Sequence, residues 1–151
     1  MIEKLLREDR ILLNLKAKDK EGVLREMVSV LNLPKDKEDL LISSLMQREK
    51  LGSTGIGKGI AIPHCRSVAV DNITLIVGIS KEGVDFDSLD GKPVHIIFML
   101  VATPMDPSMQ YLTALGNIAK IARGLANEEN IKTDFSSPKE VIDYLLNFYN
   151  E

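Results

Sequence analysis

The residues best suited to chemistry in this chain lie between positions 48 and 64. This segment contains Arg48, the run Ser53-Thr54-Gly55 and, after a short apolar stretch, His64. Near neutral pH an imidazole keeps a large unprotonated fraction, which can act as a nucleophile. The sequence therefore predicts a prepared site around His64.

Glycines dominate the same segment, because four of the ten in the chain fall between positions 52 and 59. Their spacing does not match a dinucleotide fingerprint, and Lys58 is wrongly placed for a P-loop. Glycines let a backbone pass close to a ligand and turn its amide groups inward. We expect residues 53–59 to be a loop that approaches a ligand, with a plain flexible connector as the alternative.

Arg48 follows Leu41 and Leu45 at helical spacing, so it should point along the apolar face of its helix. An unpaired guanidinium on a buried face is costly, so Arg48 must pair with an acid or await an anion. The alternative is a charge that complements the C-terminus of the helix, with Glu49 beside it.

The second of the two histidines, His95, lies near the start of the apolar run 94–102 and shares a strand face with Ile97 and Met99. A histidine in such surroundings is usually hydrogen-bonded and structural. It could equally project from the start of the strand toward His64. Sequence spacing alone does not decide between the two.

Two histidines and an arginine without a strong metal-binding pattern suggest phosphoryl transfer on nitrogen. This chemistry asks mainly for in-line positioning and for stabilisation of the phosphoryl oxygens. Arg48, the loop amides and the hydroxyls of Ser53 and Thr54 are suitable donors to those oxygens. The mechanism needs neither a metal nor a cofactor.

A metal-binding module built from His64, Cys65 and His95 is an alternative from a different class. Structural zinc sites usually show closely spaced ligand pairs such as Cys-x-x-Cys, and the adjacent pair His64-Cys65 makes an awkward chelate. Catalysis by Cys65 has only its adjacency to His64 in its favour. We therefore expect no metal site.

Composition narrows the class of protein. With 151 residues and 44% hydrophobic content, the chain fits one domain, residues 1–151, that needs no disulfides or metals. The net charge of −3 argues against a nucleic-acid partner, which asks for a basic surface. A single cysteine and a charged N-terminus without a signal-peptide pattern favour a soluble, cytoplasmic protein. The longest apolar run is too short for a membrane span.

Hydrophobic periodicity predicts the elements that position these residues. Helices are expected from Asp19 to Leu33, from Asp36 to Gly52, after an N-cap at Asp106 with Pro107 as first residue, and after the capping box Ser137–Glu140. Strands are expected at residues 11–15, 60–63, 73–79 and 94–102. The mixed order predicts an α/β fold, in which one mixed sheet of about four or five strands is flanked by helices on both faces.

Two segments of the chain resemble a known family. The first, from Arg48-Glu49 through Ser53-Thr54-Gly55 to Ile60-Ala61-Ile62-Pro63-His64, resembles the phosphorylation-site signature of enzyme IIA domains of the fructose/mannitol class. These domains belong to the bacterial phosphoenolpyruvate-dependent phosphotransferase system, and the class includes nitrogen-regulatory IIA proteins. The second segment, from Phe86 to His95, resembles the family's segment before its second active-site histidine.

The resemblance covers nearly the whole chain and implies a phosphotransferase component that works through a phosphohistidine. In the family the phosphorylated histidine matches His64, and residues matching Arg48 and His95 line the same pocket. The expected partners are HPr as phosphoryl donor and a IIB component as acceptor for sugar uptake, which places the protein beside a membrane permease at most. The alternative is a nitrogen-regulatory protein whose phosphorylation state controls partner proteins.

Overall fold

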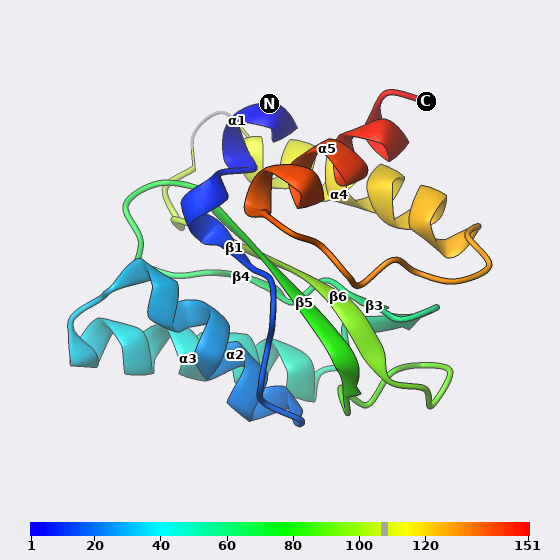
Figure 1. The fold of residues 1–151 in the computed structure, drawn as a ribbon. Coiled ribbons are helices and arrows are strands. Elements are labelled where there is room, and N and C mark those ends of the chain that lie inside the picture. Colours follow the sequence, from blue (N-terminus) through cyan, green and yellow to red (C-terminus); the bar gives the residue numbers. More distant parts are fainter. Residues whose placement is uncertain (107–108) are drawn as a thin grey trace.

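A β-sheet lies between two layers of helices (Figure 1). The computed structural model describes residues 1–106 and 109–151. The helices are α1 (Ile2–Leu5), α2 (Lys20–Val28), α3 (Lys35–Lys50), α4 (Gln110–Ala126) and α5 (Pro138–Tyr149). The strands are β1 (Ile11–Leu12), β2 (Gly55–Gly57), β3 (Ile60–Ala61), β4 (His64–Arg66), β5 (Thr74–Val84) and β6 (Val94–Ala102).

The strands form one six-stranded mixed sheet. β5 pairs antiparallel with β6 at the centre, and β1 pairs parallel with β5 on one side. On the other side β3 and β4 both run parallel to β6, one after the other, separated by Ile62 and Pro63. β2 pairs antiparallel with β3. The predicted α/β architecture is confirmed, although the sheet has more strands than the four or five expected.

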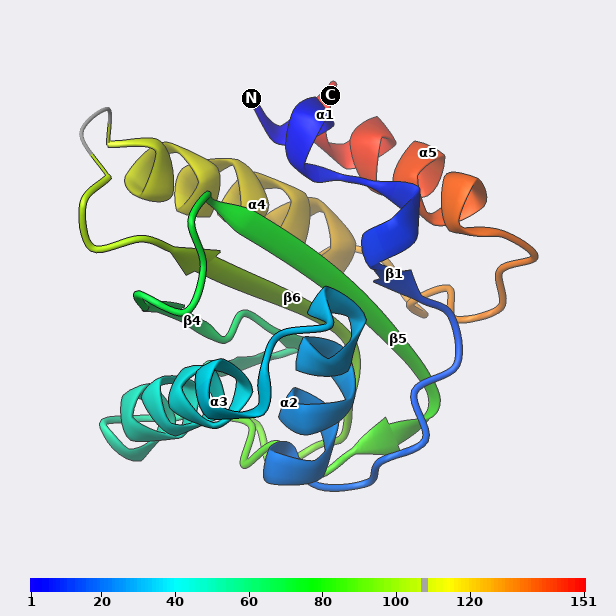
Figure 2. The ribbon, with the colours of Figure 1, turned by 90° about the vertical axis from the view of Figure 1, so that its left-hand side faces the viewer.

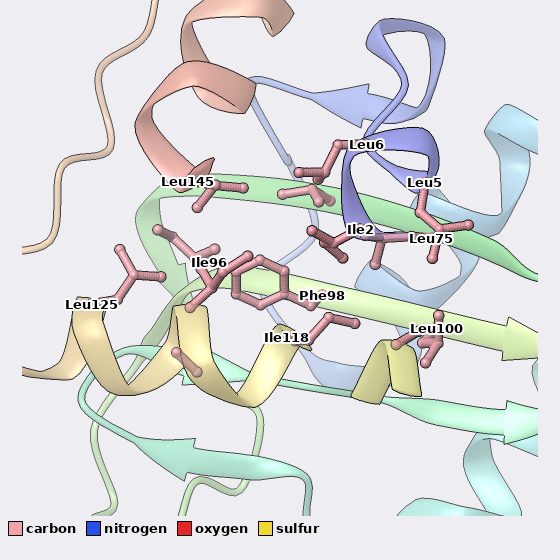
Figure 3. Close-up of a cluster of buried hydrophobic side chains, with 14 of the residues drawn as sticks. Ile2, Leu5, Leu6, Leu75, Ile96, Phe98, Leu100, Ile118, Leu125 and Leu145 are labelled. Carbon is pink, nitrogen blue, oxygen red and sulfur yellow. The ribbon is translucent and has the colours of Figure 1, made fainter. Parts of the chain in front are cut away.

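The two central strands are buried on both faces, as predicted, because each face carries its own hydrophobic core. Ile96, Phe98 and Leu100 of β6 pack with α1, α4 and α5 (Figure 3). Ile97 and Met99 point to the opposite face, which α2 and α3 cover. Figure 2 shows the two helical layers on either side of β5 and β6. This alternation follows from the two-residue period of a strand.

The glycine-rich segment is more regular than expected. Gly55–Gly57 forms β2, and the turn into β3 passes through Gly57, Lys58 and Gly59, whose φ angles are 95°, 59° and 81°. Glycine adopts such positive φ angles at little cost. At Gly55 a Cβ atom would lie 2.9 Å from the Cα of Ser88, so this position needs glycine for a close approach of two backbones.

Three helices begin at or within one residue of the predicted positions, and two of them have side-chain caps. The carboxylate of Asp19 accepts a hydrogen bond from the amide of Gly22 at the start of α2. The hydroxyl of Ser137 accepts one from the amide of Glu140 at the start of α5. α3 begins one residue before Asp36, directly after a proline. The caps at Asp19 and Ser137 are recognisable because donor and acceptor lie within one turn of each other.

The prediction for α4 is wrong in two respects. Its N-cap is Met109 rather than Asp106, which instead accepts a hydrogen bond from the amide of Tyr111 at 2.9 Å. The predicted first residue, Pro107, lies outside the described residues. Apolar spacing also predicts a buried face of Leu112, Leu115, Ala119 and Ala122, with Ile118 beside them. Ala122 and Ile118 are buried as expected, whereas Leu112 is exposed, because apolar residues surround much of this helix and leave its orientation open. The side chains that α4 buries are Tyr111, Ala114, Ile118, Ile121, Ala122 and Leu125.

Within the described ranges, none of the helices combines the length and apolar character needed to cross a membrane.

Candidate functional site

His64 begins β4, where it lies beside Leu100 of β6. The imidazole is half-buried, and its Nδ1 atom lies 2.7 Å from the carbonyl oxygen of Ile62. A carbonyl can only accept a hydrogen bond, so Nδ1 carries the hydrogen in this arrangement. In the neutral ring the lone pair is then on Nε2. The backbone thus selects which nitrogen is available as a nucleophile.

Arg66 and Tyr111 lie beside this histidine, although sequence reasoning missed both. Arg66 follows His64 by two residues on β4, so both side chains leave the same face of the strand. The guanidinium carbon of Arg66 is 4.6 Å from the centre of the Tyr111 ring. That ring, in turn, is centred 6.3 Å from the imidazole of His64.

Arg48 adds a second positive charge to this neighbourhood. Its side chain is half-buried, and Nη1 donates a hydrogen bond of 2.8 Å to the carbonyl oxygen of Gly52. Burial raises the pKa of the Tyr111 phenol to about 12, while the charges of Arg66 and Arg48 act to lower that pKa. Arg48 lies in the last turn of α3, which packs against β4, the strand that carries His64 and Arg66.

Ser53, Thr54 and Gly55 do not offer the free phosphate donors that the sequence suggested. The Ser53 hydroxyl donates to the carbonyl oxygen of Phe86 and accepts from the amide of Gly55. The hydroxyl and the amide of Thr54 both donate to the carboxylate of Glu49. These groups hold the loop in place, so the prediction that they bind phosphate has no support in this geometry.

The structure does not bring His95 to His64. Leu100 of β6 lies beside His64, and His95 lies five residues before Leu100 on the same strand. Five residues correspond to roughly 16 Å along a strand. Its Nδ1 atom is 2.8 Å from the carbonyl oxygen of Ser80, and its ring lines a separate cleft of about 630 Å³. The expectation that His95 lines the His64 pocket is wrong, because the register between β4 and β6 could not be derived from the sequence.

The same separation excludes a metal site built from His64, Cys65 and His95, because His64 and His95 cannot bind one ion across that distance. Cys65 lies between His64 and Arg66 on β4, so strand alternation points it to the opposite face, among the side chains under α2 and α3. Burial raises the pKa of this thiol to about 12. A thiol with so little thiolate at neutral pH is a poor nucleophile and a poor metal ligand.

The sequence of residues 4–148 matches the family described as phosphoenolpyruvate-dependent sugar phosphotransferase system, EIIA 2. Since this match spans almost all of the chain, the protein belongs to that family. The family named from the sequence resemblance is thereby confirmed.

Relatives with two kinds of name are similar to this chain. The fructose-specific EIIABC component of Bacillus subtilis (strain 168) is 38% identical over 99% of the chain, which spans only 23% of that protein's length. A nitrogen regulatory protein of Pseudomonas aeruginosa is 38% identical over 78% of the chain and 77% of its own length.

A solved structure agrees with both the sequence relationship and the fold. The nitrogen regulatory protein IIA-Ntr from Neisseria meningitidis superposes with a TM-score of 0.78 at 31% identity, over 95% of this chain and 98% of the other. The mixed sheet with helices on both faces is thus shared between the two proteins.

Proposed function

We propose that the protein is a phosphocarrier that accepts a phosphoryl group on His64 from phosphorylated HPr and passes it to a IIB component. The observation that carries this proposal is the hydrogen bond between Nδ1 of His64 and the carbonyl oxygen of Ile62. It leaves Nε2 as the nucleophile, and it fixes the plane of the ring before the donor arrives. Membership of the enzyme IIA family supports the same chemistry.

The transfer consists of one bond exchange at phosphorus. The lone pair on Nε2 of His64 attacks the phosphorus of the donor phosphohistidine, and the bond from phosphorus to the donor nitrogen breaks. That nitrogen recovers the electron pair, so no external oxidant, reductant or metal enters the balance. As Nε2 bonds to phosphorus, positive charge develops on the ring. The Ile62 carbonyl then stabilises the Nδ1–H group more strongly.

Arg66 and Arg48 supply positive charge where the phosphoryl oxygens carry negative charge. Phosphoryl transfer gains most from preorganised electrostatic stabilisation of these oxygens. Tyr111 holds Arg66 by its ring face, and its phenol stays protonated at neutral pH since its pKa is raised to about 12. The tyrosine therefore positions a cation without adding a negative charge to the site.

The decisive experiment compares the two histidines. The protein is incubated with phosphoenolpyruvate, enzyme I and HPr, and the bound phosphate is counted by mass spectrometry. Wild-type protein and His95→Ala should each gain one acid-labile, alkali-stable phosphate, whereas His64→Ala should gain none. Both histidines are half-buried, so the two variants are matched in expected cost to the fold. Full labelling of a folded His64→Ala would overturn the proposal.

A regulatory role is the second candidate, because the Neisseria and Pseudomonas relatives are named nitrogen regulatory proteins. The acceptance step is common to both candidates, so the two differ in the fate of the phosphoryl group. A carrier should lose its phosphate to a purified fructose-type IIB domain within seconds. A regulator should keep its phosphate in the presence of that domain.

A further inference from the structure

A buried ion pair connects the start of α2 to the last turn of α3. The ammonium of Lys20 lies 3.0 Å from Oε1 of Glu49, and only 12% and 2% of the two side chains are exposed. The same ammonium lies 5.0 Å from the centre of the Phe86 ring. Burial of a charged pair is costly unless its remaining hydrogen-bonding capacity is also used. The remaining hydrogen-bond partners of Glu49 therefore decide whether this buried ion pair is stable.

Those partners are both on Thr54, which is itself buried. The amide of Thr54 donates to Oε1 of Glu49 at 3.0 Å, and its hydroxyl donates a short bond to Oε2. Glu49 therefore fixes both the backbone and the side-chain rotamer of Thr54, which lies five positions further along the chain.

Hydrogen bonds continue from Thr54 to the imidazole. The carbonyl oxygen of Thr54 accepts the amide of Ile62 at 3.0 Å. The carbonyl oxygen of Ile62 accepts Nδ1–H of His64 at 2.7 Å. Successive hydrogen bonds in this series share the residues Thr54 and Ile62, each of which donates through its amide and accepts through its carbonyl oxygen. The series therefore connects Lys20 to His64 through the backbone of these two residues. Glu49 also directly follows Arg48, so the same pair fixes the helix turn that carries this arginine.

We propose that Lys20, Glu49 and Thr54 are positioning residues that set the orientation and tautomer of His64 through the backbone of Ile62. This inference rests on the proposed role of His64 as phosphoryl acceptor. None of the three residues touches the phosphoryl group. Their effect is to hold Nδ1–H against its carbonyl, so that Nε2 is aimed before the donor docks.

The test separates orientation from stability. The central variant is Thr54→Val, which removes the hydroxyl but keeps the shape and the backbone amide. Thr54→Ser restores the hydroxyl, and Lys20→Met/Glu49→Gln removes both charges so that none is left buried alone. Asp39→Asn is the control, since Asp39 lies on α3 in an exposed ion pair with Lys35.

Two measurements are made on each folded variant. ¹⁵N chemical shifts of the imidazole report the His64 tautomer in the unphosphorylated protein. Rapid quenching gives the single-turnover rate of phosphoryl transfer from phosphorylated HPr and the HPr concentration at half-saturation. We expect Thr54→Val and the double variant to show a mixed tautomer and about a tenfold slower transfer, with half-saturation unchanged. Thr54→Ser and Asp39→Asn should match the wild type.

Folded Thr54→Val and double variants with the wild-type tautomer and the wild-type rate would overturn the inference. A wild-type protein that accepts no phosphate would instead overturn the proposed function. In that case the ¹⁵N measurement still tests whether Thr54 controls the imidazole. The two failures are therefore distinguishable.

Discussion

At the scale of single residues, the alternation of side chains along β4 determines which groups face the candidate site. His64 and Arg66 leave one face of the strand, and Cys65 between them leaves the other. The guanidinium of Arg66 and the imidazole of His64 therefore share a side, while the thiol is buried under α2 and α3. A three-residue strand thus separates two groups that could otherwise react with the same electrophile.

The arginines give the first prediction. Charge-assisted hydrogen bonds to an anion contribute about 1.5–3 kcal/mol each, so Arg48→Ala and Arg66→Ala should each slow transfer to His64 by about ten- to a hundredfold. Lysine at either position should restore only part of the rate, because the planar guanidinium is lost. Quenched-flow labelling measures the rates, with Arg25→Ala on α2 as the control. Unchanged rates in Arg48→Ala would leave Arg48 as a charge at the end of a helix.

Cys65 gives the second prediction. With its pKa raised to about 12 by burial, only about one thiol in ten thousand is ionised at pH 8. Iodoacetamide should therefore leave the folded protein unmodified over an hour at pH 8, and should add one group per chain in guanidinium. Rapid alkylation of the native protein would show that this thiol is accessible and activated.

At the scale of elements, the caps of α2 and α5 and the central strands are predictable, whereas the start of α4 and the edge of the sheet are not. Asp19 and Ser137 cap their helices through partners three residues away, and the apolar runs of β5 and β6 identify strands buried on both faces. The Gly55–Gly57 strand has no hydrophobic pattern of its own, because its pairing with β3 and its contact with residue 88 define it.

The same difference between local signals and tertiary packing explains which residues of the candidate site could be predicted. Arg66 was within reach of a sequence argument, since two residues along a strand return to the same face. Tyr111 was not, because its approach to His64 depends on how α4 packs on the sheet. His95 was misplaced for a related reason, since a pairing register decides which part of β6 lies beside β4. Sequence thus identifies local partners, whereas tertiary packing decides which of them meet.

The cap of α5 gives the prediction at this scale. Hydrogen bonds from Lys132, and then from Ser136, lower the pKa of Glu140 from its ordinary 4.5 to about 2. A carboxyl with a lowered pKa stabilises the fold above about pH 4.5, and this stabilisation is lost as the pH falls toward about 2. Glu140→Gln should therefore lower the melting temperature at pH 7, and the difference from wild type should shrink on acidification. Glu129→Gln is the surface control, and a difference independent of pH would contradict this reading.

At the scale of the whole molecule, the sheet supports two separate cores, one under α1, α4 and α5 and one under α2 and α3. Phe98 is fully buried in the first. Phe98→Ala should lower the free energy of unfolding by about 3–5 kcal/mol. Leu89, 76% exposed, is the control, and Leu89→Ala should change this free energy by less than about 0.5 kcal/mol. Urea unfolding followed by circular dichroism measures both.

Because the site lies at the edge of the sheet, its position affects how the ability to accept phosphate is lost on heating. Arg48 comes from α3 in one helical layer, Tyr111 comes from α4 in the other, and His64 comes from the strand between them. Detachment of the α2–α3 layer would remove Arg48 from the site, and detachment of the layer with α4 would remove the Tyr111 ring that packs on Arg66. Either loss can precede the loss of secondary structure. On heating, the ability to accept phosphate should therefore disappear no later than the circular dichroism signal of the helices. A protein that still accepts phosphate should therefore have both helical layers packed on the sheet.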